Sequence, residues 1–137
     1  MIRPAAPDDA PAMGAILSDW IDATPWMPRI HTRAEDAAFC ASLVPHAWIA
    51  GEREGFMALR TGEVAALYVA APARRRGLGG ALIEHAKAVS DALSLWTFEV
   101  NAPARRFYAR HGFAETRRTD GENDEGLPDV RLEWRRG

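Results

Sequence analysis

Helically spaced and alternating apolar residues divide this chain into helices and strands. Between Met13 and Ile21 the apolar side chains recur every three or four residues, which predicts a helix that Asp8 or Asp9 caps and that ends near Asp22. Three further helices are predicted: one from the capping-box pair Thr32 and Glu35 to Leu43, one along the apolar stripe from Leu78 to Val89, and one from Pro103 to His111. Strands are predicted at Ile2–Ala5, His46–Gly51, Gly55–Arg60, Glu63–Val69, Leu95–Val100, Phe113–Arg118 and Val130–Arg135.

The order of these elements, βααβββαβαββ, predicts an α/β (α+β) fold. Short turns join the early strands, so these strands should pair antiparallel, whereas the βαβ unit in the second half requires a crossover. We therefore expect a mixed, mostly antiparallel sheet of six to seven strands with helices on both faces. The chain has 137 residues and no linker-like segment, so we expect a single domain over residues 1–137.

Composition and charge narrow the classes of function. The formal net charge is −2, which predicts no general attraction to nucleic acid. No apolar run is long enough to span a membrane and the first residues lack the features of a signal peptide, so we expect a cytoplasmic protein with no membrane contact. Cys40 is the only cysteine and the histidines form no cluster, so we expect no disulfide and no metal site.

The segment from Glu63 to Lys87 carries the most specific chemistry. An apolar strand leads into three arginines and a run of glycines, and a helix follows. Glycine can adopt backbone angles closed to other residues, so several N–H groups can converge on one anion, and the helix N-terminus adds unpaired N–H donors. A pyrophosphate site is therefore expected at Arg74, Arg75, Arg76, Gly77, Leu78, Gly79 and Gly80.

Two other phosphate-binding motifs fit this loop less well. A dinucleotide fold requires Gly or Ala where the bulky Leu82 stands, although Glu99 falls about where a ribose-binding acid would lie. A P-loop fails because no Gly-Lys-Ser/Thr follows the glycines.

The spacing Arg74-x-x-Gly77-x-Gly79 after the strand resembles the acetyl-CoA loop of the GNAT N-acetyltransferase superfamily, in particular its small single-domain bacterial members. A second segment, from Asn101 to Phe113, resembles the family pattern N-x-x-A-x-x-F-Y-x-x-x-G-F at every motif position. The resemblance implies the GNAT fold and direct transfer of an acetyl group from acetyl-CoA to a primary amine of a small molecule or peptide, without a metal.

The resemblance also implies roles for individual residues. The backbone of Leu67, Tyr68 and Val69 would pair with pantetheine, and an N–H of Leu67 or its neighbour would polarise the thioester carbonyl. The amide of Asn101 would bond the amides of pantetheine. Tyr108 would protonate the departing thiolate.

The resemblance does not identify a general base, because apolar Ala65 and Ala66 stand where many relatives have a polar group. By the period of two, Glu63 should share a strand face with Leu67, and Glu99 should share one with the asparagine that ends its strand. Either carboxylate can deprotonate the amine, and either can equally be part of a solvated surface.

The residues Trp20, Trp26, His31 and Asp124 mark the candidate acceptor site. In the family, the first two helices and the last hairpin usually set acceptor specificity, and tryptophans beside carboxylates can hold a cationic amine with an apolar body. The tryptophans can equally fill gaps in the core while the acidic loop is solvated. The alternative function is a non-catalytic acyl-CoA-binding sensor or partner-binding module on the same fold, and formation of a homodimer stays open.

Overall fold

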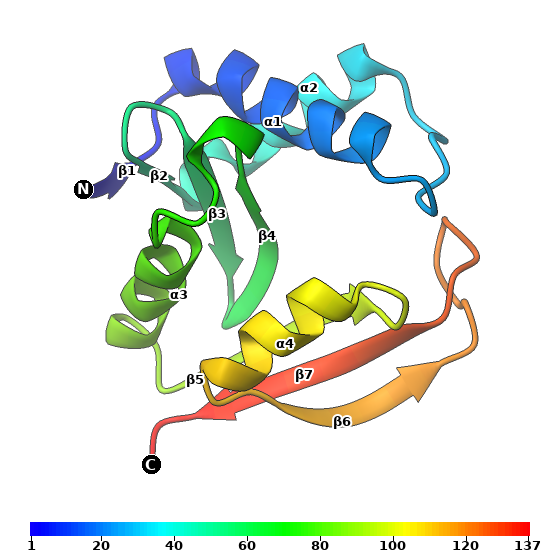
Figure 1. The fold of residues 1–137 in the computed structure, drawn as a ribbon. Helices are drawn as coiled ribbons and strands as arrows, with labels where there is room; N and C mark the ends of the chain where they lie inside the picture. The colour runs from blue at the N-terminus through cyan, green and yellow to red at the C-terminus, as the bar shows by residue number, and fades with distance from the viewer.

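A seven-stranded sheet in the order β1-β2-β3-β4-β5-β7-β6 organises the molecule, and the computed structural model describes all residues 1–137 (Figure 1). The strands are β1 (Ile2–Pro4), β2 (Ala47–Ala50), β3 (Gly55–Arg60), β4 (Glu63–Val69), β5 (Ala92–Phe98), β6 (Ala114–Thr119) and β7 (Asp129–Arg135). The helices are α1 (Ala10–Ala23), α2 (Arg33–Leu43), α3 (Leu78–Ala88) and α4 (Ala102–Arg110), with short 3₁₀ turns at Pro7–Asp9, Val44–His46 and Ala71–Ala73. The predicted α/β fold with a mostly antiparallel sheet is confirmed.

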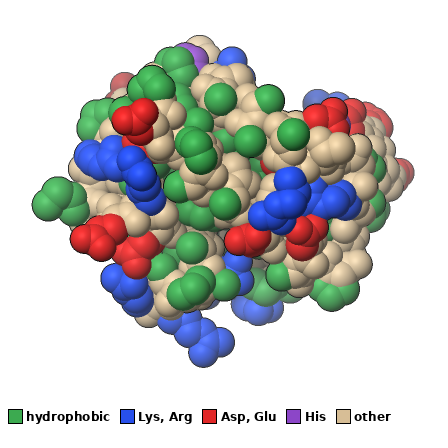
Figure 2. Space-filling model, turned by 90° about the horizontal axis from the view of Figure 1, so that it is seen from above, with side chains coloured by type: hydrophobic (Ala, Val, Ile, Leu, Met, Phe, Trp, Pro, Cys, Tyr) green, Lys and Arg blue, Asp and Glu red, His purple; other side chains and the backbone are tan.

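Helices cover both faces of the sheet, as expected from the order of elements (Figure 1). The pleat of β3 shows the two layers: Phe56 packs under α1 and α2 with Leu17, while its neighbour Met57 packs under α3 with Leu82. On the outer surface of α1 and α2, acidic and basic side chains lie beside one another (Figure 2). No helix is both long enough and apolar enough to cross a lipid bilayer.

The starts of α1 and α2 differ in how they are capped. At α2 the predicted capping box is present: Glu35 N donates to Thr32 Oγ1 (3.0 Å) and Thr32 N donates to Glu35 Oε1 (2.8 Å). The expected cap of α1 by an aspartate is wrong, because no side chain bonds its first turn. The carboxylate of Asp9, which is 1% exposed, instead accepts hydrogen bonds from Arg3 (2.8 and 2.9 Å) and Arg53 (2.8 Å).

A bulge in β4 changes which side chains share a face. Ala66 pairs with Ala58 and Val64 pairs with Leu59, so Ala65 is an extra residue without a partner on β3. As a result Val64 packs in the layer under α3, whereas Ala66 packs under α1 and α2. The prediction that Glu63 shares a face with Leu67 is therefore wrong, because the bulge interrupts the alternation between them.

The parallel strands β4 and β5 touch at one point only. They pair at Glu63 and Ser94, near their starts, and then diverge, whereas β4 pairs with β3 and β5 pairs with β7 along nearly their whole lengths. The divergence of the two strands follows from this single pairing. It opens the sheet toward the carboxyl ends of both strands.

Candidate active site

A cleft of about 900 Å³ lies where β4 and β5 diverge. Its walls come from both strands, from the start of α3, from α4 and from the loop after α1. The cleft brings together almost every residue expected to bind the cofactor: the segment 67–69, Arg74, Arg75, Gly77, Leu78, Gly79, Gly80, Asn101 and Tyr108. Two segments more than twenty residues apart in sequence thus meet at one site.

The glycine loop leaves a row of backbone donors without protein partners. Gly77 has φ +78° and Arg75 has φ +68°, so the chain turns sharply before α3 begins. Ala81 N donates to Gly77 O (3.0 Å), but the N–H groups of residues 75–80 donate to no backbone acceptor. With the positive end of the helix dipole behind them, these donors suit a phosphate group.

The three arginines of the loop point in different directions. Arg74 Nε donates to Val69 O (3.2 Å), and both Arg74 and Arg75 line the cleft. Arg76 lies outside the cleft and forms an ion pair with Glu54 (2.7 Å). The positive charge that reaches the cleft from this loop therefore comes from two arginines, not three.

Half of the backbone at the end of β4 faces the gap. Ala70 N donates to Glu54 O (2.8 Å), which is on the side of β3. Hydrogen-bonded and non-hydrogen-bonded pairs alternate along an antiparallel ladder, so Leu67 and Val69 point their N–H and C=O groups away from β3. With no strand beyond them at this level, both N–H groups and the C=O of Leu67 are available to a ligand, whereas Val69 O already accepts from Arg74 Nε.

Tyr108 and Asn101 hold the other wall of the cleft. Tyr108 is 8% exposed and packs edge-on against Phe107 and Phe113, at ring-centroid distances of 5.1 and 5.4 Å. Burial raises the pKa of Tyr108 well above its ordinary value, so the phenol stays protonated at neutral pH. Asn101 Oδ1 accepts from Ala104 N (3.2 Å) and caps α4, which leaves the amide NH₂ as its free group.

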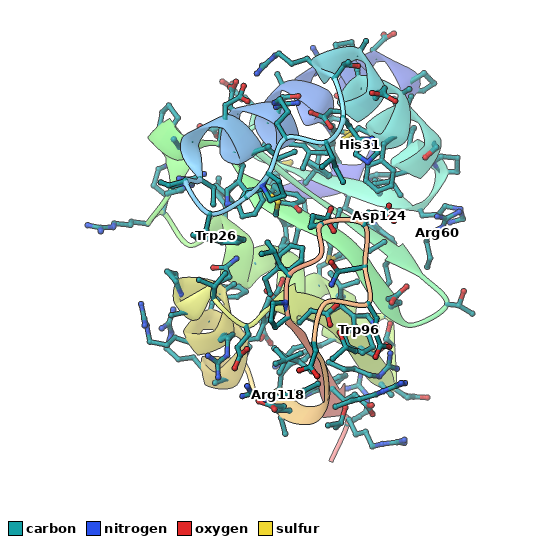
Figure 3. All side chains as sticks on the ribbon, turned by 90° about the vertical axis from the view of Figure 1, so that its right-hand side faces the viewer. Trp26, His31, Arg60, Trp96, Arg118 and Asp124 are labelled. Atoms are coloured by element: carbon teal, nitrogen blue, oxygen red, sulfur yellow. The ribbon has the colours of Figure 1, made fainter.

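Neither carboxylate considered as a base lines the cleft. Glu63 lies at the start of β4, at the closed end of the gap. Glu99 forms an ion pair with Arg118, which is labelled in Figure 3. No aspartate or glutamate lines the cleft; besides arginines, its titratable side chains are Tyr68, Tyr108 and His111.

Of the residues expected to bind the acceptor, two lie in the cleft and two do not. Trp20 and Trp26 line it. His31 is exposed, lies 4.0 Å from Glu35 at the start of α2, and is apart from Trp26 in Figure 3. Asp124 is exposed on the loop between β6 and β7, stands apart from Trp26 in Figure 3, and does not line the cleft.

Sequence reasoning missed several residues that line the cleft or its surroundings. Phe98 on β5 and His111 at the end of α4 both line it. Beside it, Glu122 and Glu125 of the β6–β7 loop line a second hollow of about 480 Å³, which shares Phe98 with the cleft. Strand alternation gave no signal for Phe98, because it places Phe98 on the face opposite to Asn101, and β5 in fact ends at Phe98. Only the loop conformation distinguishes these two carboxylates from Asp124.

Comparison with known proteins agrees with this geometry. Residues 43–115 match the family described as the acetyltransferase (GNAT) domain. The chain belongs to the GNAT family. As a GNAT enzyme it is an acetyl-CoA-dependent N-acetyltransferase, which confirms the enzyme predicted from the two motifs.

Named relatives of this GNAT enzyme include the peptidyl-lysine N-acetyltransferase YiaC of Escherichia coli, 34% identical over 82% of this chain and 82% of its own length. The peptidyl-lysine N-acetyltransferase YjaB of Salmonella typhimurium is 31% identical over 93% of this chain and 91% of its own length. Among solved structures, apo YjaB from E. coli has a TM-score of 0.81 at 27% identity and covers 100% of this chain and 98% of that one. YncA from S. typhimurium, solved with acetyl-CoA, has a TM-score of 0.74 at 18% identity, which shows a shared fold.

Proposed function

We propose that this GNAT enzyme transfers the acetyl group of acetyl-CoA directly to the primary amine of a lysine side chain in a peptide or protein. The observation that carries the proposal is the single cleft between the diverging strands β4 and β5. Backbone N–H donors suited to a phosphate group and the side chain of Tyr108 lie on one side of the cleft, and aromatic side chains lie on the other. Such a cleft can admit two substrates from opposite faces of the sheet.

On the side of α3 and α4, the chain binds and orients acetyl-CoA. The N–H groups of residues 75–80, together with Arg74 and Arg75, hold the pyrophosphate. The outward N–H groups of Leu67 and Val69 and the C=O of Leu67 pair with the pantetheine arm, as an added strand would. One of these N–H groups stabilises the negative charge that develops on the thioester oxygen.

Proton transfer then involves one identified acid and no carboxylate base. Tyr108 donates its proton to the leaving thiolate, since burial keeps the phenol protonated at neutral pH. The amine loses its proton to water in the cleft, because no aspartate or glutamate lines it. Holding amine and thioester together supplies much of the rate, an effect that can reach about 7–11 kcal/mol.

The choice of a lysine acceptor rests on two supports. The relatives that match most of this chain are named peptidyl-lysine N-acetyltransferases. The acceptor side of the cleft is aromatic and lies beside the surface loop that follows α1, which suits a side chain presented on a peptide.

Acetylation of defined peptides tests this function. The enzyme is incubated with acetyl-CoA and peptides that contain one internal lysine and a blocked N-terminus, with a lysine-to-norleucine peptide as the matched control. Thiol release and a single acetyl group on the lysine, located by mass spectrometry, are expected. Acetylation of free N-termini or small amines alone would contradict the lysine assignment, and binding of acetyl-CoA without turnover on any amine would support the sensor.

A further inference from the structure

Four aromatic rings cross the acceptor side of the cleft, from one diverging strand to the other. Tyr68 on β4 contacts Trp20 on α1 (5.4 Å between ring centroids), Trp20 contacts Trp26 in the next loop (5.8 Å), and Trp26 contacts Phe98 on β5 (5.8 Å). All four side chains line the cleft. We call these four residues the aromatic arc.

The aromatic arc lies on the face of the sheet opposite to the candidate acid. Tyr68 packs against the buried layer under α1 and α2, whereas Tyr108 belongs to the layer under α3 and α4. Both tyrosines nevertheless line the same cleft, because the strands that would separate them diverge. A molecule that passes along the arc therefore arrives at the gap from the side away from the phosphate-binding loop.

The charge distribution around the arc is also informative. No carboxylate lines the cleft, and the acidic side chains Glu122 and Glu125 line the adjoining hollow instead. Aromatic faces attract a cation and pack against methylene groups, but they hold an ammonium ion less firmly than a buried carboxylate would. Loss of water in such a channel favours the neutral amine, which is the form that attacks the thioester.

We propose that the aromatic arc is the acceptor channel and selects amines carried at the end of an unbranched methylene stem. The stem packs along the rings of Trp20, Trp26 and Phe98, and the amine emerges at the gap beside Leu67. A short stem would leave the amine among the rings, away from the thioester. This specificity deepens the proposed lysine acetylation and rests on it.

Replacement of Trp26 tests the arc by steady-state kinetics. In Trp26→Leu, an apolar side chain remains but the ring is lost, and the KM for the lysine peptide should rise about tenfold. Trp26→Phe should restore most of the affinity, while KM for acetyl-CoA changes little in both variants. Trp134→Leu is the matched control, because Trp134 on β7 lines neither hollow.

A series of acceptors gives the second measurement. Peptides that carry lysine, ornithine or diaminopropionate at the same position should lose kcat/KM as the stem shortens in the wild-type enzyme, and Trp26→Leu should discriminate less among them. An unchanged KM in Trp26→Leu, an equal rise in Trp134→Leu, or equal use of all three stems would overturn the proposal. If free alkylamines react and lysine peptides do not, the proposed function fails, and the same comparison with alkylamines of increasing length still decides the role of the arc.

Discussion

At the scale of single residues, Tyr108 is the side chain on which the proposed chemistry depends most. Tyr108→Phe removes one hydroxyl and keeps the ring that packs against Phe107 and Phe113, so folding and acetyl-CoA binding should survive. We expect kcat to fall on the order of tenfold to a thousandfold, since general acids typically contribute about 10²–10⁴-fold and thiols leave readily. Tyr68→Phe, on the acceptor side of the same cleft, is the matched control and should keep kcat. Full kcat in Tyr108→Phe would mean that another group protonates the thiolate.

Tyr108 and the absence of a carboxylate from the cleft together predict how kcat/KM depends on pH. The acceptor amine must be neutral to react, and the ordinary pKa of lysine is about 10.4, so kcat/KM for the amine should rise steadily between about pH 6 and pH 9. Burial favours the protonated form of Tyr108 and raises its pKa above the ordinary value of a tyrosine. Its contribution to kcat as an acid is therefore lost only when the pH rises through this raised pKa. A plateau that begins below pH 7 would indicate that a side chain of the protein acts as the base.

At the scale of elements, the first turn of α3 should depend on the small size of Gly79. An ideal Cβ there would lie 3.5 Å from the ring of Phe107 and 3.9 Å from Val69, which is ordinary contact, so Gly79→Val should fold. Its two methyl groups would stand beside the free N–H donors and obstruct the phosphate. We expect the thermal shift given by CoA to vanish in this variant and to persist in Ala81→Val, on the exposed side of the same turn. A normal shift in Gly79→Val would place the pyrophosphate elsewhere.

The conformation of the loop between α1 and α2 should depend on the hydrogen bonds of Arg29. Its guanidinium bonds Asp22 (2.6 Å), Asp36 (3.0 Å) and the carbonyl of Ser18 (3.0 Å), and Asp36 is only 3% exposed. Arg29→Met should lower the free energy of unfolding, because it leaves the buried carboxylate of Asp36 without its cation. Denaturant titration measures this loss, and adding Asp36→Asn should recover part of it. An unchanged free energy of unfolding would show that solvent already satisfies Asp36. Because the loop carries Trp26, the KM for the amine should rise in Arg29→Met as well.

At the scale of the whole molecule, the site exists because the sheet is two half-sheets joined at one residue pair. β1 to β4 form one half, β5 to β7 form the other, and only Glu63 and Ser94 pair across the junction. The first half brings the glycine loop and Tyr68 to the cleft, and the second brings Asn101, Tyr108 and Phe98. We therefore expect activity only when the two half-sheets keep this relative position, even though the residues proposed to bind each substrate come from different parts of the chain.

Much of the cofactor side could be predicted from the sequence, because its signals are local. The residues from Arg74 to Gly80 are contiguous, and the backbone freedom of glycine acts wherever the loop lies. Arg76 is the exception, since its ion pair with Glu54 depends on a distant turn. The expected roles of these residues, and the choice of acceptor, remain predictions for the variants above.

The candidate base and the candidate acceptor-binding residues could not be predicted as well as the glycine loop, because the direction of a side chain depends on distant partners. Glu63 was assigned to a face by simple alternation, which the bulge at Ala65 interrupts. Glu99 pairs with Arg118 on β6, and His31 and Asp124 lie on surface loops outside the cleft. Whether such residues reach a cleft depends on how loops and strands meet, which spacing along the chain does not encode.

By itself, then, the sequence determined the order of helices and strands, the two GNAT motifs and the location of the glycine loop before the third helix. These features follow from apolar periodicity and from glycine backbone freedom, both of which act over a few residues. Only the tertiary structure decided the divergence of β4 and β5, the position of Arg76 and the aromatic arc formed by Trp20, Trp26, Tyr68 and Phe98. The physical reason is that strand register and the packing of helices on the sheet bring together residues far apart in sequence, and no local pattern specifies which of them meet.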